Sequence, residues 1–245
     1  MAARTVGLTS RTSVVAGLSN PRFSPLKKIC EVAVEQVQQV LLEAFTTVGL
    51  PRAIKVDNGR PLGDPRRETI PVLALWLVAL GIKVIFNRVR VPQDNAKVER
   101  MQGVLSNWTE WRKCANTQEL QQRLDREVDF HNTKYRVSRL NLKTRAEVFP
   151  NLLRSPIPFD PTDFDVQRAI DFVAQGRWER EVSSHGQFSH WGQRIQIKIT
   201  YAHKRLSLKL NAHTNQWEAF APNGELVVAF NSRISKDNLW NLNLS

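Results

Sequence analysis

The chain of 245 residues has only two cysteines, Cys30 and Cys114, and their spacing matches neither a metal-ligand motif nor a disulfide framework. This scarcity excludes the small disulfide-stapled class and is typical of a reducing compartment. Long hydrophobic runs are also missing, because the longest, from Val72 to Leu80, is too short to span a bilayer. Arg4 and Arg11 interrupt any signal-peptide pattern, so we expect a cytoplasmic protein.

Acidic residues are scarce relative to basic ones. Lys and Arg number 35 and Asp and Glu 23, a net charge of +12. Residues 1–150 hold 24 basic and 14 acidic side chains, whereas residues 151–245 hold 11 and 9. A surplus of this size predicts attraction to polyanions, most often nucleic acid, and places the binding surface mainly on the first part. A merely basic protein without a nucleic-acid partner is the alternative. A hydrophobic content of 42% excludes global disorder.

Helical and strand-like segments alternate in the first part of the chain, which predicts an α/β layer domain over residues 1–150. Gly49 and Gly81 are expected to end two of the helices. The predicted order is a strand at Thr12–Leu18, a helix at Glu31–Val48, a strand at Ala53–Val56, a helix at Ile70–Leu80 with Pro71 in its first turn, a strand at Ile82–Phe86, and helices at Asn95–Arg112 and Thr117–Asn132.

The end of the chain has a different pattern. Residues 151–184 are predicted to be a linker that carries a short helix at Asp163–Val173. From residue 185 onward apolar residues alternate with polar ones, and the turn Pro222-Asn223-Gly224 predicts a hairpin between Gln216–Phe220 and Leu226–Phe230. Several short strands within residues 185–245 predict a small β-barrel that binds DNA or assists assembly.

Two carboxylates stand out in the α/β part. Asp57, in Asp57-Asn58-Gly59, follows a strand, and such positions present side chains at one edge of an α/β sheet. Glu99 lies within the run from Pro92 to Arg100, on a polar helix face away from the predicted apolar stripe. Clustered carboxylates bind Mg²⁺, and two such ions stabilise the entering and leaving oxygens when a phosphodiester is cut or joined. Each residue alone is more often an ordinary turn or a solvated helix residue.

Several neighbours would support this site. Asn58 and Gly59 would shape the turn, and Asn95 would cap the helix that carries Glu99. The candidate phosphate-contacting residues are basic and flank the same run: Arg88, Arg90, Lys97 and Arg100.

The stretch from Arg11 to Pro150 resembles the integrase core domain shared by bacterial insertion-sequence transposases and retroviral integrases, the DDE family. The resemblance implies an RNase H-like fold in which two Asp and one Glu hold two Mg²⁺ or Mn²⁺ ions. Asp57 matches the second Asp and Glu99 the Glu. His131-Asn132 and the segment 144–149 resemble the end of that core, and the C-terminal strands resemble the small barrel that follows it in Mu-like transposases.

The resemblance also implies partners, namely double-stranded DNA at element ends and targets, and self-association or pairing with intact transposase subunits. A nucleoid-associated location follows. The first Asp of the family has no counterpart, since no Asp precedes Asp57 and the earliest acidic residue is Glu31. The 41 residues between Asp57 and Glu99 exceed the usual family spacing, and the Pro61–Ile70 loop can hold the excess.

Three hypotheses follow: a metal-dependent nucleotidyl transferase, a DNA-binding or regulatory protein without chemistry, and a remnant that began after the first catalytic strand. Two other groups carry less weight. The spacing of His185, His190 and His203 matches no metal site. The tryptophans at positions 108, 111, 191 and 217 could stack on bases but fit a core role better.

Overall fold

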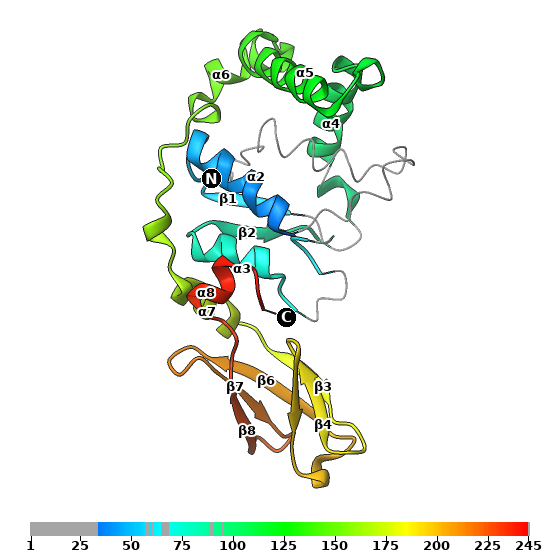
Figure 1. Cartoon of the computed structure of the whole chain (residues 1–245), viewed down its shortest axis with the longest axis vertical. Coiled ribbons are helices and arrows are strands. Elements are labelled where there is room, and N and C mark those ends of the chain that lie inside the picture. The colour runs from blue at the N-terminus through cyan, green and yellow to red at the C-terminus, as the bar shows by residue number, and fades with distance from the viewer. Residues whose placement is uncertain are drawn as a thin grey trace. The chain divides into compact units, whose positions relative to one another are not determined.

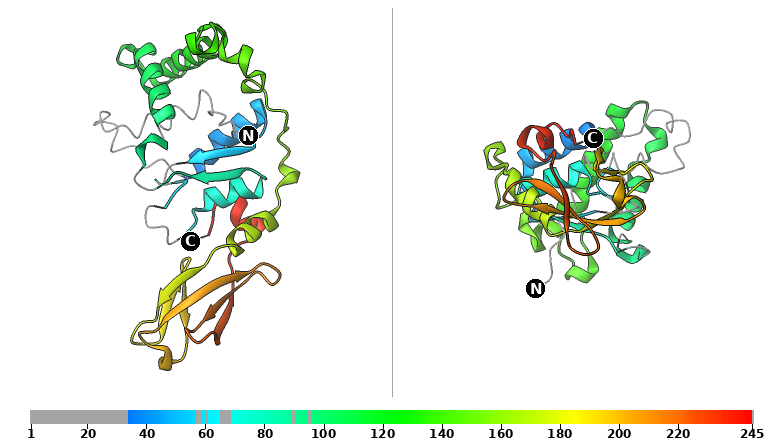
Figure 2. Two further views of the ribbon diagram at one scale, coloured as in Figure 1. Left: turned by 180° about the vertical axis from the view of Figure 1, so that it is seen from behind. Right: turned by 90° about the horizontal axis from the view of Figure 1, so that it is seen from below.

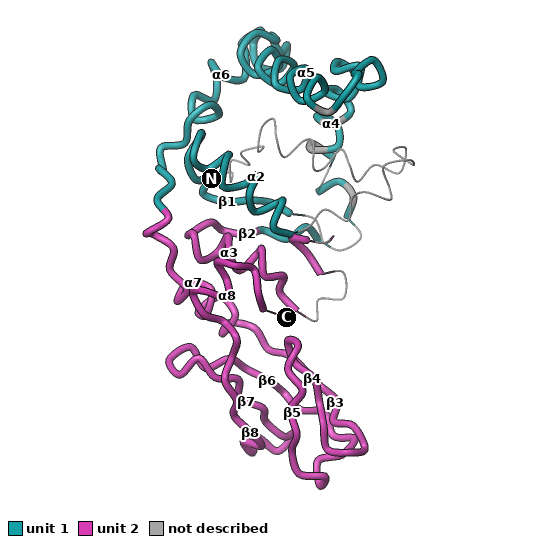
Figure 3. The backbone as a smooth tube through the Cα atoms, in the orientation of Figure 1, with its two compact units in different colours: residues 1–57, 85–160 teal, residues 58–84, 161–245 magenta. Residues whose placement is uncertain are grey.

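The computed structural model describes residues 34–56, 59, 61–64, 69–88, 91–94 and 96–244 (Figure 1). Helices and sheets are both present, which confirms the α/β class. The strand expected at Thr12–Leu18 lies outside the described residues. The chain separates into two compact units, residues 1–57 with 85–160 and residues 58–84 with 161–245 (Figure 3). No described helix combines the length and apolar character that crossing a membrane requires.

The first unit is built mainly from helices and one strand pair. Strand β1 pairs with β2, the second half of which belongs to this unit. Its elements are α2 (Val34–Val48), β1 (Ala53–Val56), β2 (Lys83–Phe86), the 3-10 turn η1 (Pro92–Asp94), α4 (Ala96–Trp108), η2 (Trp111–Lys113), α5 (Thr117–Asp129), the π-helical turn η3 (Phe130–Lys134), η4 (Ser138–Leu140), α6 (Arg145–Val148) and η5 (Pro150–Leu152).

Helix α2 forms where the apolar spacing predicted it. Val37, Leu41 and Phe45 recur every four residues and are buried on one face. Gly49 ends the helix with φ +91°, a backbone angle at which a residue with a Cβ is strained. A Cβ there would also lie 2.5 Å from the carbonyl oxygen of Ile157, so close backbone packing requires glycine at this position.

Helix α4 is shorter than the predicted Asn95–Arg112. It ends at Trp108, and Glu110 then adopts a left-handed conformation with φ 45° before the separate turn η2 begins. The hydroxyl of Thr109 donates to the carbonyl of Leu105 at 2.8 Å, so a side chain takes part in closing the last helical turn. The periodicity of the sequence did not reveal this break, because Trp111 continues the apolar pattern.

The second unit contains α3 and the C-terminal strands. Helix α3 is apolar all round, and Leu73, Trp76 and Leu77 are fully buried in it. It packs against α7 and α8, with the rings of Trp76 and Trp240 6.4 Å apart. The elements of this unit are α3 (Val72–Ala79), the first half of β2, η6 (Pro161–Asp163), α7 (Val166–Ala174), β3 (Trp178–Glu181), β4 (Gln187–His190), β5 (Gln193–Gln196), η7 (Ile199–Tyr201), β6 (Arg205–Asn211), β7 (Gln216–Phe220), β8 (Leu226–Asn231) and α8 (Lys236–Trp240).

The N-terminal end of α3 differs in detail from the sequence-based prediction, whereas its end at Gly81 agrees with it. Pro71 precedes the first turn and does not lie within it, since its φ and ψ are −58° and 141°. At the other end the N–H groups of Gly81 and Ile82 donate to the carbonyls of Val78 and Leu77, the two hydrogen bonds of a Schellman cap. Gly81 has the positive φ of 79° that this cap needs.

The C-terminal strands form an open sheet and a separate hairpin, so the predicted barrel is not closed (Figure 2). Among the described strands, the antiparallel sheet has the order β3-β6-β7-β8, and β4 pairs only with β5. The edge strands β3 and β8 each have one partner, which leaves the sheet open. The alternation of Leu206, Leu208 and Leu210 is confirmed, because all three are fully buried.

The sheet begins earlier than predicted. Strand β3 lies in the segment expected to be linker, and Trp178 pairs with Leu208 across it. The ring of Trp178 meets that of Trp217 edge to face at 5.1 Å. A four-residue strand with Trp as its one large apolar residue carries too little periodicity to be recognised from sequence.

Candidate functional site

A cluster of charged side chains joins the strand before Asp57 to the start of the helix that carries Glu99. The side chain of Arg88 donates to both carboxylate oxygens of Asp94, with Nη2 to Oδ1 at 2.9 Å and Nε to Oδ2 at 3.1 Å. The backbone N–H of Arg88 adds a third bond to Oδ2 at 3.0 Å. Lys55 of β1 donates to the backbone carbonyl of Asp94 at 3.0 Å. We call these three residues the Asp94 clamp.

The clamp determines the charge state of its carboxylate. Hydrogen bonds from Arg88 hold the pKa of Asp94 far below its ordinary value, and the charge of Lys55 acts in the same direction. The hydrogen bonds with Asp94 in turn raise the pKa of the Arg88 guanidinium. Asp94 is therefore ionised in the folded protein and already surrounded by two internal cations, so it is a poor candidate for a metal ligand.

The strand end beside Asp57 is held by backbone bonds. Strand β1 stops at Val56, whose carbonyl accepts the N–H of Asn87 at 2.9 Å. Gly59 accepts the N–H of Gly63 at 2.8 Å. The remaining predicted residues of this region lie outside the described residues: Asp57, Asn58, Arg90 and Asn95.

Helix α4 presents Glu99 to solvent. Glu99 and Arg100 are both exposed, and so are Gly103 and Ser106, whereas Leu105 on the opposite face is buried. This arrangement agrees with the prediction of one polar face and one apolar stripe. The backbone of Lys97 lies in the first turn of the same helix, and its side chain lies outside the described part.

The two-metal centre that the family resemblance implies would require a cluster of metal-binding side chains. Within the described residues, no three His, Cys, Asp or Glu side chains lie close enough together to hold a metal ion. The carboxylate that precedes the helix of Glu99 most closely is Asp94, and the clamp occupies it. The resemblance matches two of the family's three carboxylates, Asp57 and Glu99, to this sequence, and of these two only Glu99 lies within the described residues.

The sequence did not reveal the role of Lys55 and Asp94. Lys55 was an ordinary basic residue two positions before Asp57, and Asp94 was one of several polar residues before a helix. Arg88 was predicted to contact phosphate, and the structure places its guanidinium on Asp94 while 73% of the side chain stays exposed. No short-range pattern signals the contact between Lys55 and Asp94, because these two residues are 39 positions apart.

A second cluster surrounds the end of α4. The ring of Trp108 lies 5.3 Å from Tyr135 and 5.8 Å from both Phe130 and His131. Burial lowers the pKa of His131, and the nearby charge of Arg145 lowers it further. The core end that the sequence suggested at Thr144–Phe149 begins with a capping box, in which Thr144 and Glu147 bond reciprocally.

The three histidines considered in the sequence analysis differ in their exposure to solvent. His185 and His203 are exposed, whereas His190 is 1% exposed and lies 4.3 Å from the ring of Trp217. Neither ring nitrogen of His190 has a hydrogen-bond partner among the residues that the structure describes.

No model of a known protein family matches the chain.

Proposed function

We propose that this protein binds double-stranded DNA and acts in DNA transposition or integration, with an RNase H-like core of the DDE type. The observation that carries the proposal is the Asp94 clamp, which ties the strand preceding Asp57 to the segment that starts the helix of Glu99. A DDE enzyme requires its strand-end Asp and helix Glu to lie close enough to share metal ions. The clamp supports that arrangement through residues that the family resemblance did not invoke.

Charge supports the choice of DNA as partner. Of the net charge of +12, a surplus of +10 falls within residues 1–150. Glu99 and Arg100 lie on an exposed, mostly small and polar face of α4, where a long polymer has access. A cation beside a carboxylate on such a face suits a phosphate backbone approached by metal ions.

The chemistry of this chain alone is incomplete in our proposal. Asp57 and Glu99 would hold Mg²⁺ or Mn²⁺ weakly, because the third carboxylate of the family has no counterpart here. Strand transfer would then need intact transposase subunits that supply a full carboxylate set. Without such subunits the protein would act as a DNA-binding or regulatory partner.

The DNA-binding part is tested by fluorescence anisotropy of the full chain on a labelled duplex at several salt concentrations. We expect binding that persists in EDTA and falls steeply with salt, by roughly 10³-fold or more between 50 and 200 mM if six or more phosphates are contacted. Replacing both Lys97→Gln and Arg100→Gln should weaken it, whereas Glu99→Gln should not. Absence of binding at low salt contradicts the proposal.

A strand-joining assay with Mg²⁺ or Mn²⁺ tests the chemical part. We expect no joining of DNA ends by this chain alone. Joining that disappears in Asp57→Asn would show that the chain assembles a working centre without a third carboxylate of its own, and would overturn the claim of incomplete chemistry while leaving the DNA-binding claim intact.

A further inference from the structure

A second charged surface lies away from the predicted catalytic residues, in the loop 134–145 between α5 and α6. We call it the basic loop. Five basic and no acidic side chains occur between Asp129 and Glu147. The basic residues are Lys134, Arg136, Arg139, Lys143 and Arg145. The function proposed above assigns no role to any of them.

The basic loop has a defined conformation. The N–H of Val137 donates to the carbonyl of Lys143 at 3.1 Å, and the N–H of Leu142 donates back to Val137 at 3.1 Å. Nη1 of Arg136 adds a bond to the carbonyl of Leu142 at 3.0 Å. Because these bonds close the loop on itself, its cations are presented on an ordered backbone, which lowers the entropy lost on binding.

The base of the loop is attached to α4. Arg145 donates to the carbonyl of His131 at 2.8 Å, and its guanidinium lies over the ring of Tyr135 at 5.8 Å. Tyr135 in turn packs against Trp108, the last residue of α4. Trp108 follows Glu99 by nine residues, which corresponds to about 14 Å along a helix axis. One turn of duplex DNA is about 34 Å long, so a single duplex can reach both regions.

The cations of the loop are available to a ligand. Lys134, Arg136, Arg139 and Lys143 are exposed, and within the described chain none of them forms an ion pair. Arg145 is partly buried, and its pKa is lowered first by burial and then by the charge of Arg139. The carboxylate of Glu147 offsets part of the charge of Arg136 and Lys143. The cations left in excess repel one another, and a bound polyanion relieves that repulsion.

The tip of the loop is strained and apolar. Asn141 and Leu142 have φ of 54° and 57°, a left-handed conformation that is unusual for a bulky residue such as leucine. The side chain of Leu142 is 61% exposed, so core packing does not explain the strain. Strained backbone that presents an exposed side chain is common at binding surfaces. An apolar tip flanked by cations suits the groove of a nucleic acid, where leucine often contacts sugars and bases.

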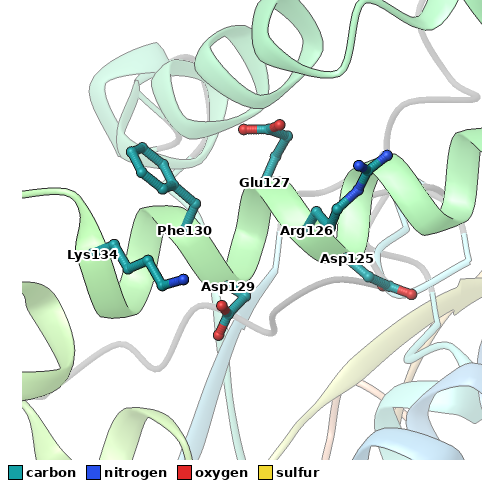
Figure 4. A pocket seen from close by; sticks show the side chains of 6 residues that line it. All are labelled: Asp125, Arg126, Glu127, Asp129, Phe130 and Lys134. Carbon is teal, nitrogen blue, oxygen red and sulfur yellow. The ribbon is translucent and has the colours of Figure 1, made fainter.

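The neighbouring surface of α5 has a different character. A shallow hollow there is lined by Asp125, Glu127 and Asp129 together with Arg126, Phe130 and Lys134 (Figure 4). Its mixed charges, three of them acidic, offer no concentrated positive field. A phosphate chain is therefore drawn to the basic loop and not to this hollow.

From these observations we infer that the basic loop binds the phosphate backbone of duplex DNA and sets Leu142 against its groove. The inference rests on the proposed DNA-binding function and adds a contact surface to it. Arg139 and Lys143 are the principal phosphate contacts, since both are exposed and, within the described residues, neither side chain donates a hydrogen bond. Arg136 and Arg145 mainly hold the loop in shape.

The test measures duplex affinity of the full chain against salt for the double variant Arg139→Gln with Lys143→Gln. We expect the slope of log affinity against log salt to fall by about two, one for each lost phosphate contact, with about tenfold weaker binding at 0.1 M salt. The control is Arg52→Gln with Arg154→Gln, which removes the same charge from two exposed positions outside the loop. The charge-conserving pair Arg139→Lys with Lys143→Arg should retain the affinity of the natural chain, which separates loss of contact from loss of fold.

Each outcome bears on the inference. An unchanged slope, or an equal fall in the control pair, overturns it. If the loop pair has no effect while Lys97→Gln with Arg100→Gln weakens binding, the loop inference fails and the proposed function stands. If the natural chain does not bind duplex DNA at low salt, both fail.

Discussion

Arg88 binds Asp94 through two side-chain bonds and one backbone bond, so a residue that follows β2 holds the residue that precedes the helix of Glu99. The pairing joins two residues six positions apart across the turn between strand and helix. Lys55 of β1 completes it from the strand that leads to Asp57. The three residues therefore tie strand β1 to the segment after β2 and to the turn η1 that precedes α4.

The clamp predicts a coupled response to substitution. Arg88→Gln and Asp94→Asn should each lower the free energy of unfolding, and the double variant should lower it by less than the sum, because both remove one interaction. Urea unfolding of the four proteins measures the coupling. The exposed Arg52→Gln serves as control and should change stability by no more than about 0.5 kcal/mol. Strict additivity would show that the pair contributes nothing to the fold.

The clamp also predicts a dependence on pH. The pKa of Asp94 lies below its ordinary 3.8, so its stabilising effect is present above about pH 4 and is lost as the pH falls further. Asp94→Asn should therefore unfold with a shallower dependence on pH in the acid range than the natural chain. Circular dichroism during acid titration follows the difference, and identical curves for the two proteins would contradict it.

His190 predicts a second dependence on pH, in a different range. Burial lowers its pKa from 6.5 to about 3, and the charge of Arg180 contributes in the same direction. Below pH 6.5 His190 binds a proton in the unfolded chain but stays neutral in the folded chain. The free energy of unfolding therefore falls as the pH drops from 6.5 towards 3. Between pH 6.5 and 4.5 the loss should be about 2 to 3 kcal/mol, at about 1.4 kcal/mol per pH unit.

The variant His190→Leu isolates this effect. It should remove that part of the pH dependence, because leucine of similar volume carries no titrating group into the contact with Trp217. Tryptophan fluorescence during urea unfolding at each pH provides the measurement. The exposed His213→Ala is the control and should behave like the natural chain. An equal pH dependence in His190→Leu would mean that other groups cause it.

Replacing Gly49 or Gly103 by alanine should change the stability of the protein in opposite directions. Gly49→Ala should destabilise the protein by about 2 kcal/mol or more, because φ is +91° and the new Cβ would press on the carbonyl of Ile157. Gly103→Ala should stabilise it by up to about 1 kcal/mol, since among the described residues no atom beyond its chain neighbours and its own helix backbone lies within 4 Å of the new Cβ. Thermal unfolding distinguishes them, and a similar midpoint for both variants would contradict the backbone argument.

Leu142 offers a test of stored strain. Leu142→Gly should raise stability by up to about 1 kcal/mol, because glycine adopts the positive φ of 57° without the cost that leucine incurs. The same change should weaken DNA binding if Leu142 contacts the groove. Leu153→Gly, at a half-exposed leucine with φ −90°, should instead lower stability by about 0.5–1 kcal/mol. A loss of stability in Leu142→Gly would show that the loop is not strained.

Much of the local structure follows directly from residue order. The four-residue spacing of Val37, Leu41 and Phe45 predicts α2, and the alternation in residues 206–210 predicts β6, because each pattern places its apolar side chains on one face. Gly81 predicts a helix end, since its positive φ permits the Schellman cap. Asp57 and Glu99 can likewise be recognised from sequence as candidate metal-binding residues, because each lies within a distinctive short motif.

Tertiary structure decided the rest. The pairing of Lys55 and Arg88 with Asp94, the burial of His190 among tryptophan rings, the open form of the C-terminal sheet and the contacts of α3 with α7 and α8 all join segments that local patterns treat separately. Propensity, periodicity and turn chemistry act over a few residues and say little about which distant surface an element meets. Ion pairs and buried polar groups depend on which distant segments come into contact, because their energies are determined by distance and by exclusion of water.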